Sequence, residues 1–225
     1  MREFDVGYPH SQSPRPIKKG NRANIRNKII AWEQGKEFYD GNRSSGYGGF
    51  SYDGRWSKIM PKIIEEYGLS EGSSVLEIGS KKGFFLYDLK QALPEIKVRG
   101  QEMSSYLIDN TMEPVQEFVQ LGGYDLLPFK NNEFDFVMAF GCVYILNLKG
   151  VMDCLREIQR VGKGKSYITV GAYRTEEEKD LFLEWTLLGT TILHVDEWLE
   201  VFEAVGYTGD YCFTTASSLN LVRES

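Results

Sequence analysis

The sequence predicts an α/β fold with a doubly wound, mainly parallel sheet. From Ser74 onward, short apolar runs that suit buried strands alternate with segments of helical periodicity over about 150 residues, the pattern of a parallel sheet covered by helices. The chain has 225 residues, of which 42% are hydrophobic, so it can form a core of ordinary size. We therefore expect a sheet domain at residues 57–225, preceded by a segment of different character at residues 1–56.

The strands of this sheet can be placed from their apolar runs and the turn residues between them. Seven are expected, at residues 75–78, 97–102, 117–122, 134–140, 166–173, 211–215 and 219–223. The last two follow each other without an intervening helix, so they should form an antiparallel hairpin at the C-terminal edge of the sheet.

Helices are expected between the strands, at residues 83–93, from near Ser104 with Ser104 or Ser105 as the N-cap, and at 151–161, 176–189 and 196–205. The segment 151–161 has the clearest amphipathic spacing. Asp196 is the expected N-cap of the last helix. Trp185 and Leu188 share one helical face and are expected to pack in the core rather than to contact a substrate.

The first 56 residues have a different pattern. Residues 1–20 contain three prolines and are expected to form an irregular arm, and residues 23–39 have loosely helical spacing. Residues 32–56 hold seven aromatic residues and six glycines. So many glycines disfavour a regular element, and so many rings disfavour a solvated linker, so we expect an ordered loop, with residues 46–56 as a lid.

Charge is unevenly distributed along the chain. The net charge is −6, yet residues 1–30 carry seven Lys or Arg and two acids, a net of +5, so the remainder sums to −11. An acidic body argues against a nucleic-acid partner, and no apolar run is long enough to span a membrane. The basic arm is expected either to lie on the acidic body or to contact an anionic group.

Few residues suit metal binding. The chain has two histidines, and its cysteines Cys142, Cys154 and Cys212 form no CxxC pair, so neither a metal site nor a disulfide framework is expected. Cys142 is expected to be a buried small residue rather than a nucleophile. A cytoplasmic protein is the default for such a sequence.

The turn after the first strand predicts a ligand site. Gly79 and Gly83 allow a sharp turn and a close approach to the backbone, and Glu102 ends the second strand 23 residues after Gly79. That spacing suits a carboxylate that accepts hydrogen bonds from ribose hydroxyls. The turn lacks the GxGxxG of dinucleotide sites and the GxxxxGK[ST] of P-loops, so a nucleoside without phosphates is expected and a nicotinamide dehydrogenase is rejected.

These residues resemble the motifs of one family. The segment SVLEIGSKKGFF (74–85) is similar to motif I of the class I S-adenosylmethionine-dependent methyltransferases, of Rossmann-like fold. GQEMS (100–104), GGYDLLPF (122–129) and FDFVMAF (134–140) follow in the family's order and spacing. The resemblance covers residues 57–223, and residues 35–56 resemble the leader of bacterial members that act on small molecules or glycans.

The resemblance implies S-adenosylmethionine as cofactor, S-adenosylhomocysteine as product, and a site for each part of the cofactor. Glu77 and Gly79 would bound the methionine pocket, and Phe140 would lie near it. Glu102 would bind the ribose, and Asp125 would accept from the adenine amine. The full implied set is Glu77, Gly79, Ser80, Lys81, Gly83, Glu102, Met103, Asp125, Leu126 and Phe140.

One residue departs from the family pattern, because Lys81 stands where the central glycine of motif I is usual. Its side chain would crowd the methionine pocket, turn outward, or pair with the cofactor carboxylate, as Lys82 also could. A methyltransferase with a competent site is the main interpretation. The alternative is a catalytically degenerate, methyltransferase-like binding module or partner subunit.

The resemblance and the residue types together suggest an acceptor and the residues near it. The acceptor would be a hydroxyl or amine of a small molecule or glycan precursor, and arginines in the loop would suit an anionic one. His194 is the candidate general base, although a lone histidine is often structural, and Tyr144 follows the fourth strand, where the family often places acceptor contacts. Candidates for the lid and for substrate contacts are Arg43, Tyr47, Tyr52, Arg55 and Tyr173.

Overall fold

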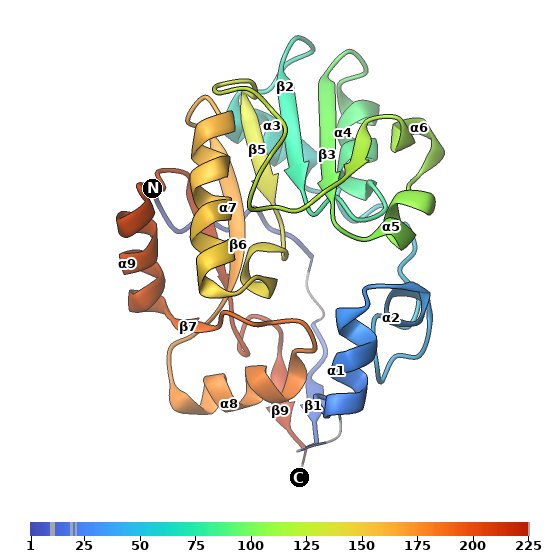
Figure 1. Ribbon diagram of the computed structural model, residues 1–225, viewed down its shortest axis with the longest axis vertical. Helices are drawn as coiled ribbons and strands as arrows, with labels where there is room; N and C mark the ends of the chain where they lie inside the picture. The colour runs from blue at the N-terminus through green and yellow to red at the C-terminus, as the bar shows by residue number, and fades with distance from the viewer. Residues whose placement is uncertain (10–11, 19, 21, 225) are drawn as a thin grey trace.

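The computed structural model describes residues 1–9, 12–18, 20 and 22–224. Its main element is a seven-stranded sheet in the order β4-β3-β2-β5-β6-β7, with β8 also paired to β6 (Figure 1). All of its pairings are parallel. The strands are β2 (Ser74–Ile78), β3 (Lys97–Glu102), β4 (Val119–Leu121), β5 (Phe136–Ala139), β6 (Ser166–Tyr173), β7 (Leu193–His194) and β8 (Asp210–Thr214). The predicted α/β class and Rossmann-like sheet are confirmed.

The predicted C-terminal hairpin is wrong. The crossover helix α9 (Val195–Val205) returns the chain to the starting end of β6, so β8 runs parallel to β6. Residues 215–220 then form a tight turn that leads the chain out of the sheet, where β9 (Leu221–Arg223) pairs in parallel with β1 (Arg15–Ile17). The arm expected to be irregular therefore supplies the partner strand, which local patterning alone does not reveal.

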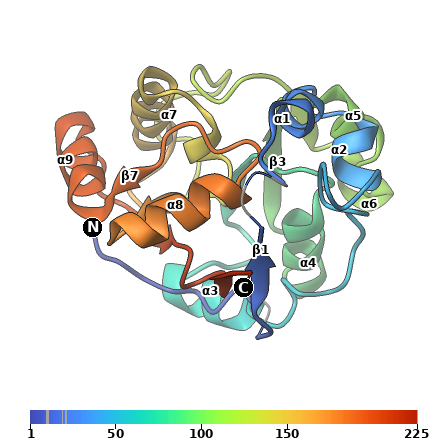
Figure 2. The same cartoon turned by 90° about the horizontal axis from the view of Figure 1, so that it is seen from below.

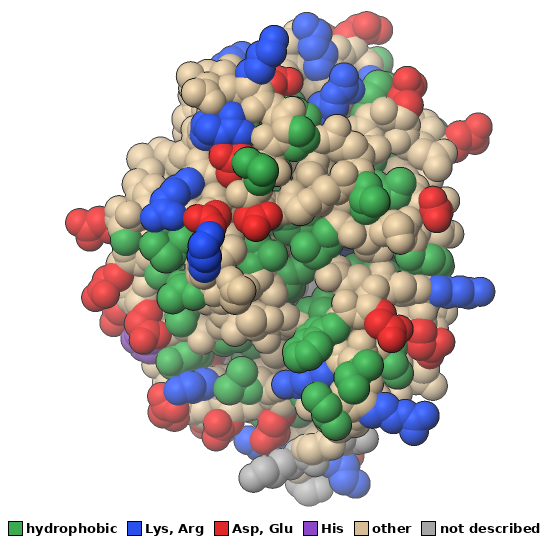
Figure 3. Space-filling view, in the orientation of Figure 1, with side chains coloured by type: hydrophobic (Ala, Val, Ile, Leu, Met, Phe, Trp, Pro, Cys, Tyr) green, Lys and Arg blue, Asp and Glu red, His purple; other side chains and the backbone are tan. Residues whose placement is uncertain are grey.

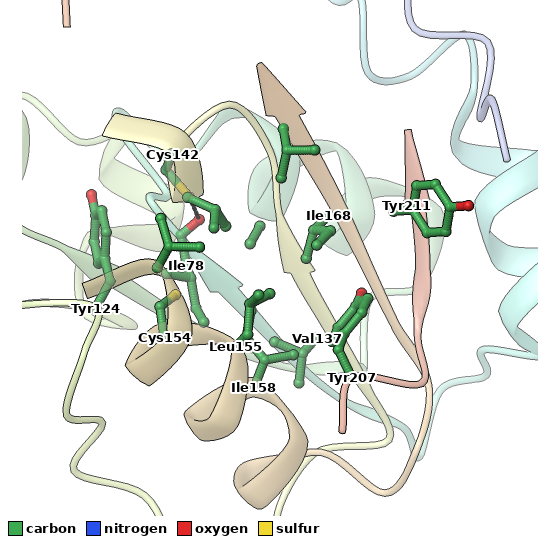
Figure 4. Packing of buried hydrophobic residues seen from close by; sticks show 14 of the residues in the cluster. Ile78, Tyr124, Val137, Cys142, Cys154, Leu155, Ile158, Ile168, Tyr207 and Tyr211 are labelled. Carbon is green, nitrogen blue, oxygen red and sulfur yellow. Dashed lines mark hydrogen bonds between the residues drawn. The ribbon is translucent and has the colours of Figure 1, made fainter. Parts of the chain in front are cut away.

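Helices cover both faces of the sheet. One face carries α7 (Leu148–Val161) and α9, and the other carries α3 (Met60–Tyr67) and α4 (Phe84–Ala92) (Figure 2). Strand β5 divides its side chains between the two cores, since Val137 and Ala139 pack toward α7 while Phe136 and Met138 pack toward α3 and α4. Figure 4 shows the first core, with Ile78 and Cys142 at one end and Tyr207 and Tyr211 at the other.

A further layer lies below the carboxyl ends of the strands. It is formed by α1 (Ile25–Trp32), α2 (Lys36–Asp40), α8 (Glu176–Trp185) and the β1–β9 pair (Figures 1 and 2). The N-terminal arm is packed rather than free, because Val6 and Ile17 are buried and Arg2 pairs with Glu66 and Asp210. The expectation that the arm lies on the acidic body is thus met by its first residues.

Three short helices complete the fold, α5 (Ser105–Asp109), α6 (Glu113–Gln116) and the 3₁₀ turn η1 (Val143–Ile145). Ser104 caps α5 as predicted, but the N-cap of α9 is His194 and not Asp196. The imidazole can take this place because its Nδ1 accepts from the Asp196 backbone N–H at 3.3 Å, while Glu197 accepts from the His194 N–H. No helix in the described part of the chain is long and apolar enough to cross a membrane.

Candidate active site

A cavity of about 470 Å³ lies where the carboxyl ends of the strands meet the layer below. Ligand sites in open α/β sheets are usually found at this edge. One side of the cavity, which we call the glycine-turn side, is formed at the ends of β2 and β5 by Glu77, Ser80, Lys81, Phe140 and Gly141. The rest of the lining comes mainly from described residues of the N-terminal segment, from Tyr8 to Trp56, and from the segment after α8.

The turn after β2 requires a glycine at its first position. Gly79 has φ +69°, and a Cβ there would lie 2.5 Å from the Cβ of Cys142, so only hydrogen fits between the two strand ends. Cys142 is buried and donates its thiol hydrogen to the Ile78 carbonyl at 3.1 Å. Burial raises the pKa of this thiol to about 12, which agrees with its expected role as a small packing residue.

Lys81 adopts the left-handed conformation that a glycine favours, with φ +53°. Its side chain turns into the cavity, and its Nζ donates to the Phe140 carbonyl oxygen at 3.1 Å. Lys82 instead pairs with Asp40 Oδ2 at 2.7 Å and joins the turn to α2. Of the alternatives left open for Lys81, the outward orientation is therefore wrong.

Two polar groups on the glycine-turn side are unpaired. Glu77 Oε2 and Ser80 Oγ are buried and have no hydrogen-bond partner among the described residues. Burial raises the pKa of the Glu77 carboxyl well above its usual range, because the charged form is poorly solvated there. Buried polar atoms without partners are rare in proteins, and here they border a cavity, so the residues present fit a polar ligand such as the methionine end of S-adenosylmethionine.

Glu102 is already engaged by the protein. Its carboxylate accepts from the backbone N–H groups of Lys81, Met103 and Ser104 at 2.8–2.9 Å and from the Tyr124 hydroxyl at 3.2 Å. The side chain is 1% exposed and does not line the cavity. The ribose role implied for Glu102 thus requires Tyr124 to move away. Tyr124 was not predicted, although it immediately precedes Asp125.

The residues implied for the adenine lie outside the cavity. Leu126 is 78% exposed, and Asp125 is exposed beside it. The Met103 sulfur accepts from Gln34 Nε2 at 3.3 Å, so the end of α1 covers the position implied for the adenine face. Gly83 caps α4 with φ +77°. The structure therefore joins the methionine-end residues in one cavity and keeps the adenine-end residues apart from it.

Residues 46–56, which were predicted to form a lid, are an ordered loop that lines the cavity. Tyr47, Phe50, Tyr52 and Trp56 all line the cavity. Tyr52 is anchored through its hydroxyl, which donates to Asp88 Oδ1 at 2.6 Å. The Trp56 ring packs edge-on against the Phe140 ring at 4.9 Å, which joins the loop to the glycine-turn side.

Four arginines line the cavity. Arg43 and Arg55 were predicted from the loop, and the structure adds Arg15 from β1 and Arg22 from the segment before α1. Arg55 pairs with Asp53. We call Arg15, Arg22 and Arg43 the arginine side of the cavity. Arg15 and Arg22 both belong to the basic arm. The net charge of that arm was recognised in the sequence, but the sequence did not indicate which of its residues would reach a site.

The residues proposed for catalysis separate into two groups. Tyr144, in η1, lines the cavity, and burial raises the pKa of its phenol, which therefore stays protonated near neutral pH. His194 and Tyr173 do not line it; their rings pack against each other at 5.5 Å beside α9. In the described part of the chain, no group of three or more His, Cys, Asp or Glu is placed to hold a metal ion.

Some cavity residues were assigned to other roles or missed. Trp185 and Leu188, expected in the core, are half-buried and face the cavity, because α8 ends at Trp185 instead of continuing to residue 189. Tyr8 lines the cavity from the arm and packs its ring 4.4 Å from the Phe140 ring. No sequence motif marks Trp185, Leu188 or Tyr8 as a site residue, because their places in the cavity depend on packing between segments that are distant in the chain.

Comparisons with known proteins agree with this geometry. Residues 76–170 match a family model described as a methyltransferase domain. Similar solved structures include a chain from the complex of the Haloferax volcanii methyltransferase activator Trm112 with a candidate methyltransferase (21% identity, TM-score 0.53, 68% of this chain and 73% of that one). The YcgJ protein of Bacillus subtilis is also similar (18%, TM-score 0.54, 65% and 66%). The [4+2]-cyclase SpnF is similar over more of this chain (15%, TM-score 0.54, 87% and 75%).

The likeness to these three structures extends to the fold alone, and no curated protein sequence matches the chain. The family match covers the strand ends and the turn that build the glycine-turn side, from β2 to β6. Residues 76–170 therefore match a methyltransferase domain, in agreement with the resemblance of their motifs to the S-adenosylmethionine-dependent methyltransferases.

Proposed function

We propose that this protein transfers the methyl group of S-adenosylmethionine to a hydroxyl or amine of a small molecule or glycan precursor in the cytoplasm. The observation that supports a small acceptor is the cavity of about 470 Å³, which lies within the range of small-molecule sites. The lid loop over it also suits an acceptor held away from water.

The glycine-turn side would hold the methionine end of the cofactor. The unpaired groups of Glu77 and Ser80 offer it hydrogen bonds, and the Lys81 ammonium offers a charge to its carboxylate. When bound, the cofactor supplies a sulfonium methyl that a nucleophile takes by in-line displacement. The task of the chain is then to align the acceptor and to exclude water.

Tyr144 is assigned here to positioning the acceptor. Its raised pKa makes it a hydrogen-bond donor near neutral pH and a poor proton acceptor. Because His194 does not line the cavity, the proposal does not use it as a base. These two points favour an acceptor whose nucleophilic group needs no strong base, such as an amine that is already unprotonated or an acidic hydroxyl.

The test is release of S-adenosylhomocysteine across nucleotide sugars, glycans and amines, together with calorimetry of cofactor binding. Tyr144→Phe should lower kcat at least about tenfold with unchanged cofactor affinity, since one hydrogen bond to the acceptor is lost. Tyr173→Phe is the matched control, because that ring lies outside the cavity. Failure of the native chain to bind S-adenosylmethionine or S-adenosylhomocysteine at about 1 mM would contradict the proposal.

A second candidate function is a degenerate binding module. Two observations favour it: Lys81 Nζ already bonds the Phe140 carbonyl, and four donors already engage Glu102. The similarity to a [4+2]-cyclase also means that the fold alone does not fix methyl transfer. Lys81→Gly separates the two candidates. If this variant binds S-adenosylhomocysteine and the native chain does not, the module is the correct description.

A further inference from the structure

The arginine side of the cavity contains cations that no carboxylate neutralises. Among the described residues, no Asp or Glu forms an ion pair with Arg15, Arg22 or Arg43. All three line the same cavity, although they come from β1, from the segment before α1 and from the loop after α2. Arg15 and Arg22 are partly buried, whereas Arg43 is exposed beside them. Partly buried charges are normally paired, so Arg15 and Arg22 indicate that the cavity takes a ligand of opposite charge.

Two of these side chains are held in place by backbone carbonyls. Arg22 donates from Nε to the Trp185 oxygen at 3.0 Å, from Nη1 to the Arg43 oxygen at 2.6 Å and from Nη2 to the Gly46 oxygen at 3.3 Å. Arg43 donates from Nη1 to the Tyr47 oxygen at 2.7 Å. Carbonyls orient a guanidinium without cancelling its charge, so the positions are preorganised and the charge remains.

The charges of the whole cavity lining also favour an anionic ligand. Its lining includes the cations Arg15, Arg22, Arg43, Arg55 and Lys81 and only two carboxylates, Glu77 and Asp53. Asp53 pairs with Arg55, and burial raises the pKa of Glu77, which favours its uncharged form. The cavity is thus positive in a chain whose net charge is −6, a contrast that focuses an anion there.

The mutual effects of the arginines support this reading. The pKa of Arg22 is lowered to about 10, first by burial and then by the charge of Arg43. Burial also lowers the pKa of Arg15, and the charges of Arg43 and Arg55 lower it further. The groups therefore repel one another across the cavity, and a bound anion would relieve that repulsion.

We propose that Arg15, Arg22 and Arg43 bind an anionic group, a phosphate or a carboxylate, of the methyl acceptor. The inference rests on the proposed function for the identity of the ligand as an acceptor. The planar guanidinium fork suits both groups, because each offers paired oxygens for bidentate hydrogen bonds. The three arginines and the residues of the glycine-turn side line one cavity, so the anion would share that cavity with the cofactor's methionine end.

The test is calorimetric titration of the full native chain with inorganic phosphate and, separately, with acetate, at constant ionic strength. Arg15→Gln and Arg43→Gln should each weaken binding of the preferred anion at least about tenfold, since each removes a charge-assisted contact. Arg156→Gln is the matched control, because it removes an equal charge from an exposed position on α7. Arg43→Lys keeps the charge and should restore part of the affinity.

The two anions and the cofactor separate the possible sources of the anionic group. Tighter binding of phosphate identifies a phosphate-bearing acceptor, and tighter binding of acetate a carboxylate. S-adenosylhomocysteine should bind native, Arg15→Gln and Arg43→Gln chains within about twofold. If both variants lose its binding as well, the arginines serve the cofactor carboxylate and the proposal is overturned. Equal anion affinity in Arg15→Gln, Arg43→Gln and Arg156→Gln would also overturn it.

The same titrations separate this inference from the proposed function. A chain that binds phosphate through the arginines but binds neither S-adenosylmethionine nor S-adenosylhomocysteine keeps the anion site and contradicts methyl transfer. A chain that methylates an uncharged acceptor and binds neither anion keeps the proposed methyl transfer and contradicts the anion site.

Discussion

The two sides of the cavity are built differently. The glycine-turn side is formed at strand ends, where sheet register and a close contact between Gly79 and Cys142 fix each position. The arginine side is formed by three separate segments, held mainly by side-chain bonds to carbonyls. Figure 3 shows hydrophobic side chains gathered where the sheet half of the molecule meets the layer below. Under the proposed function, the fold would determine the cofactor end of the cavity, whereas the added segments would determine which acceptor binds.

The largest effect is expected at the turn itself. Gly79→Ala should lower the free energy of unfolding by roughly 2–4 kcal/mol, because its Cβ would overlap Cys142 in addition to the left-handed strain. Gly206→Ala is the control, with the same φ of +69° but no heavy atom within 4 Å of the added Cβ. Chemical denaturation should show a loss of about 1 kcal/mol in the free energy of unfolding for the control. Equal losses would mean that the turn is not packed as described.

The next effect concerns the buried carboxyl on the glycine-turn side. Because burial raises the pKa of Glu77 in the folded chain, its proton stabilises the fold below the unfolded pKa, and this contribution is lost as pH rises toward the folded value. Between pH 5 and pH 8 the native chain should lose stability relative to Glu77→Gln, by about 1.4 kcal/mol per unit of pKa difference titrated.

Other carboxyls do not obscure this measurement. The pKa of Asp135, for example, is lowered to about 2 by Lys163, so its contribution is already complete above pH 5. Parallel denaturation curves for native and Glu77→Gln chains over this pH range would contradict the account of Glu77.

Substitutions of His194 test whether catalysis needs a general base that lies outside the cavity. As the N-cap of α9, His194→Ala should cost about 1 kcal/mol of stability, whereas His194→Asn should change it by only a few tenths, since asparagine also caps. Neither variant should alter kcat at a temperature where both are folded. A large loss of kcat in the well-capped asparagine variant would restore His194 as the general base.

The smallest effect is expected on the arginine side, and its sign is opposite. Arg15→Met should raise the free energy of unfolding by about 0.5 kcal/mol, because it removes a repelling charge and breaks no ion pair described here. Arg156→Met, which loses a surface pair with Asp153, should be neutral or slightly destabilising. A destabilised Arg15→Met chain would show that this arginine serves the fold rather than a ligand.

The same contrast explains what the sequence could predict. Strands β3 and β6 were placed at their observed bounds. For β6 the reason is that a parallel strand buried along its whole length is a continuous run of buried residues between turns. The turn at Gly79 was predicted from its own residues, and the roles of Glu77 and Ser80 were implied by the resemblance of the same short segment to a family motif. Each of these features depends on residues close together in the chain.

Features that depend on distant contacts were missed. The pairing of β1 with β9 joins residues about 200 positions apart, so the hairpin at 211–223 was the natural but incorrect expectation. Arg15 and Arg22 reach the cavity only through that pairing and through the Trp185 carbonyl. Likewise, nothing in the sequence indicated that Tyr124 would turn toward Glu102.

The most direct test of the account is a titration of S-adenosylhomocysteine into the native chain, with and without saturating phosphate or acetate, whichever anion binds. If the cofactor and the anion occupy different sides of one cavity, S-adenosylhomocysteine should bind in both conditions with Kd values within about twofold of each other. Absence of binding at about 1 mM, or a tenfold loss of affinity when the anion is present, would contradict it.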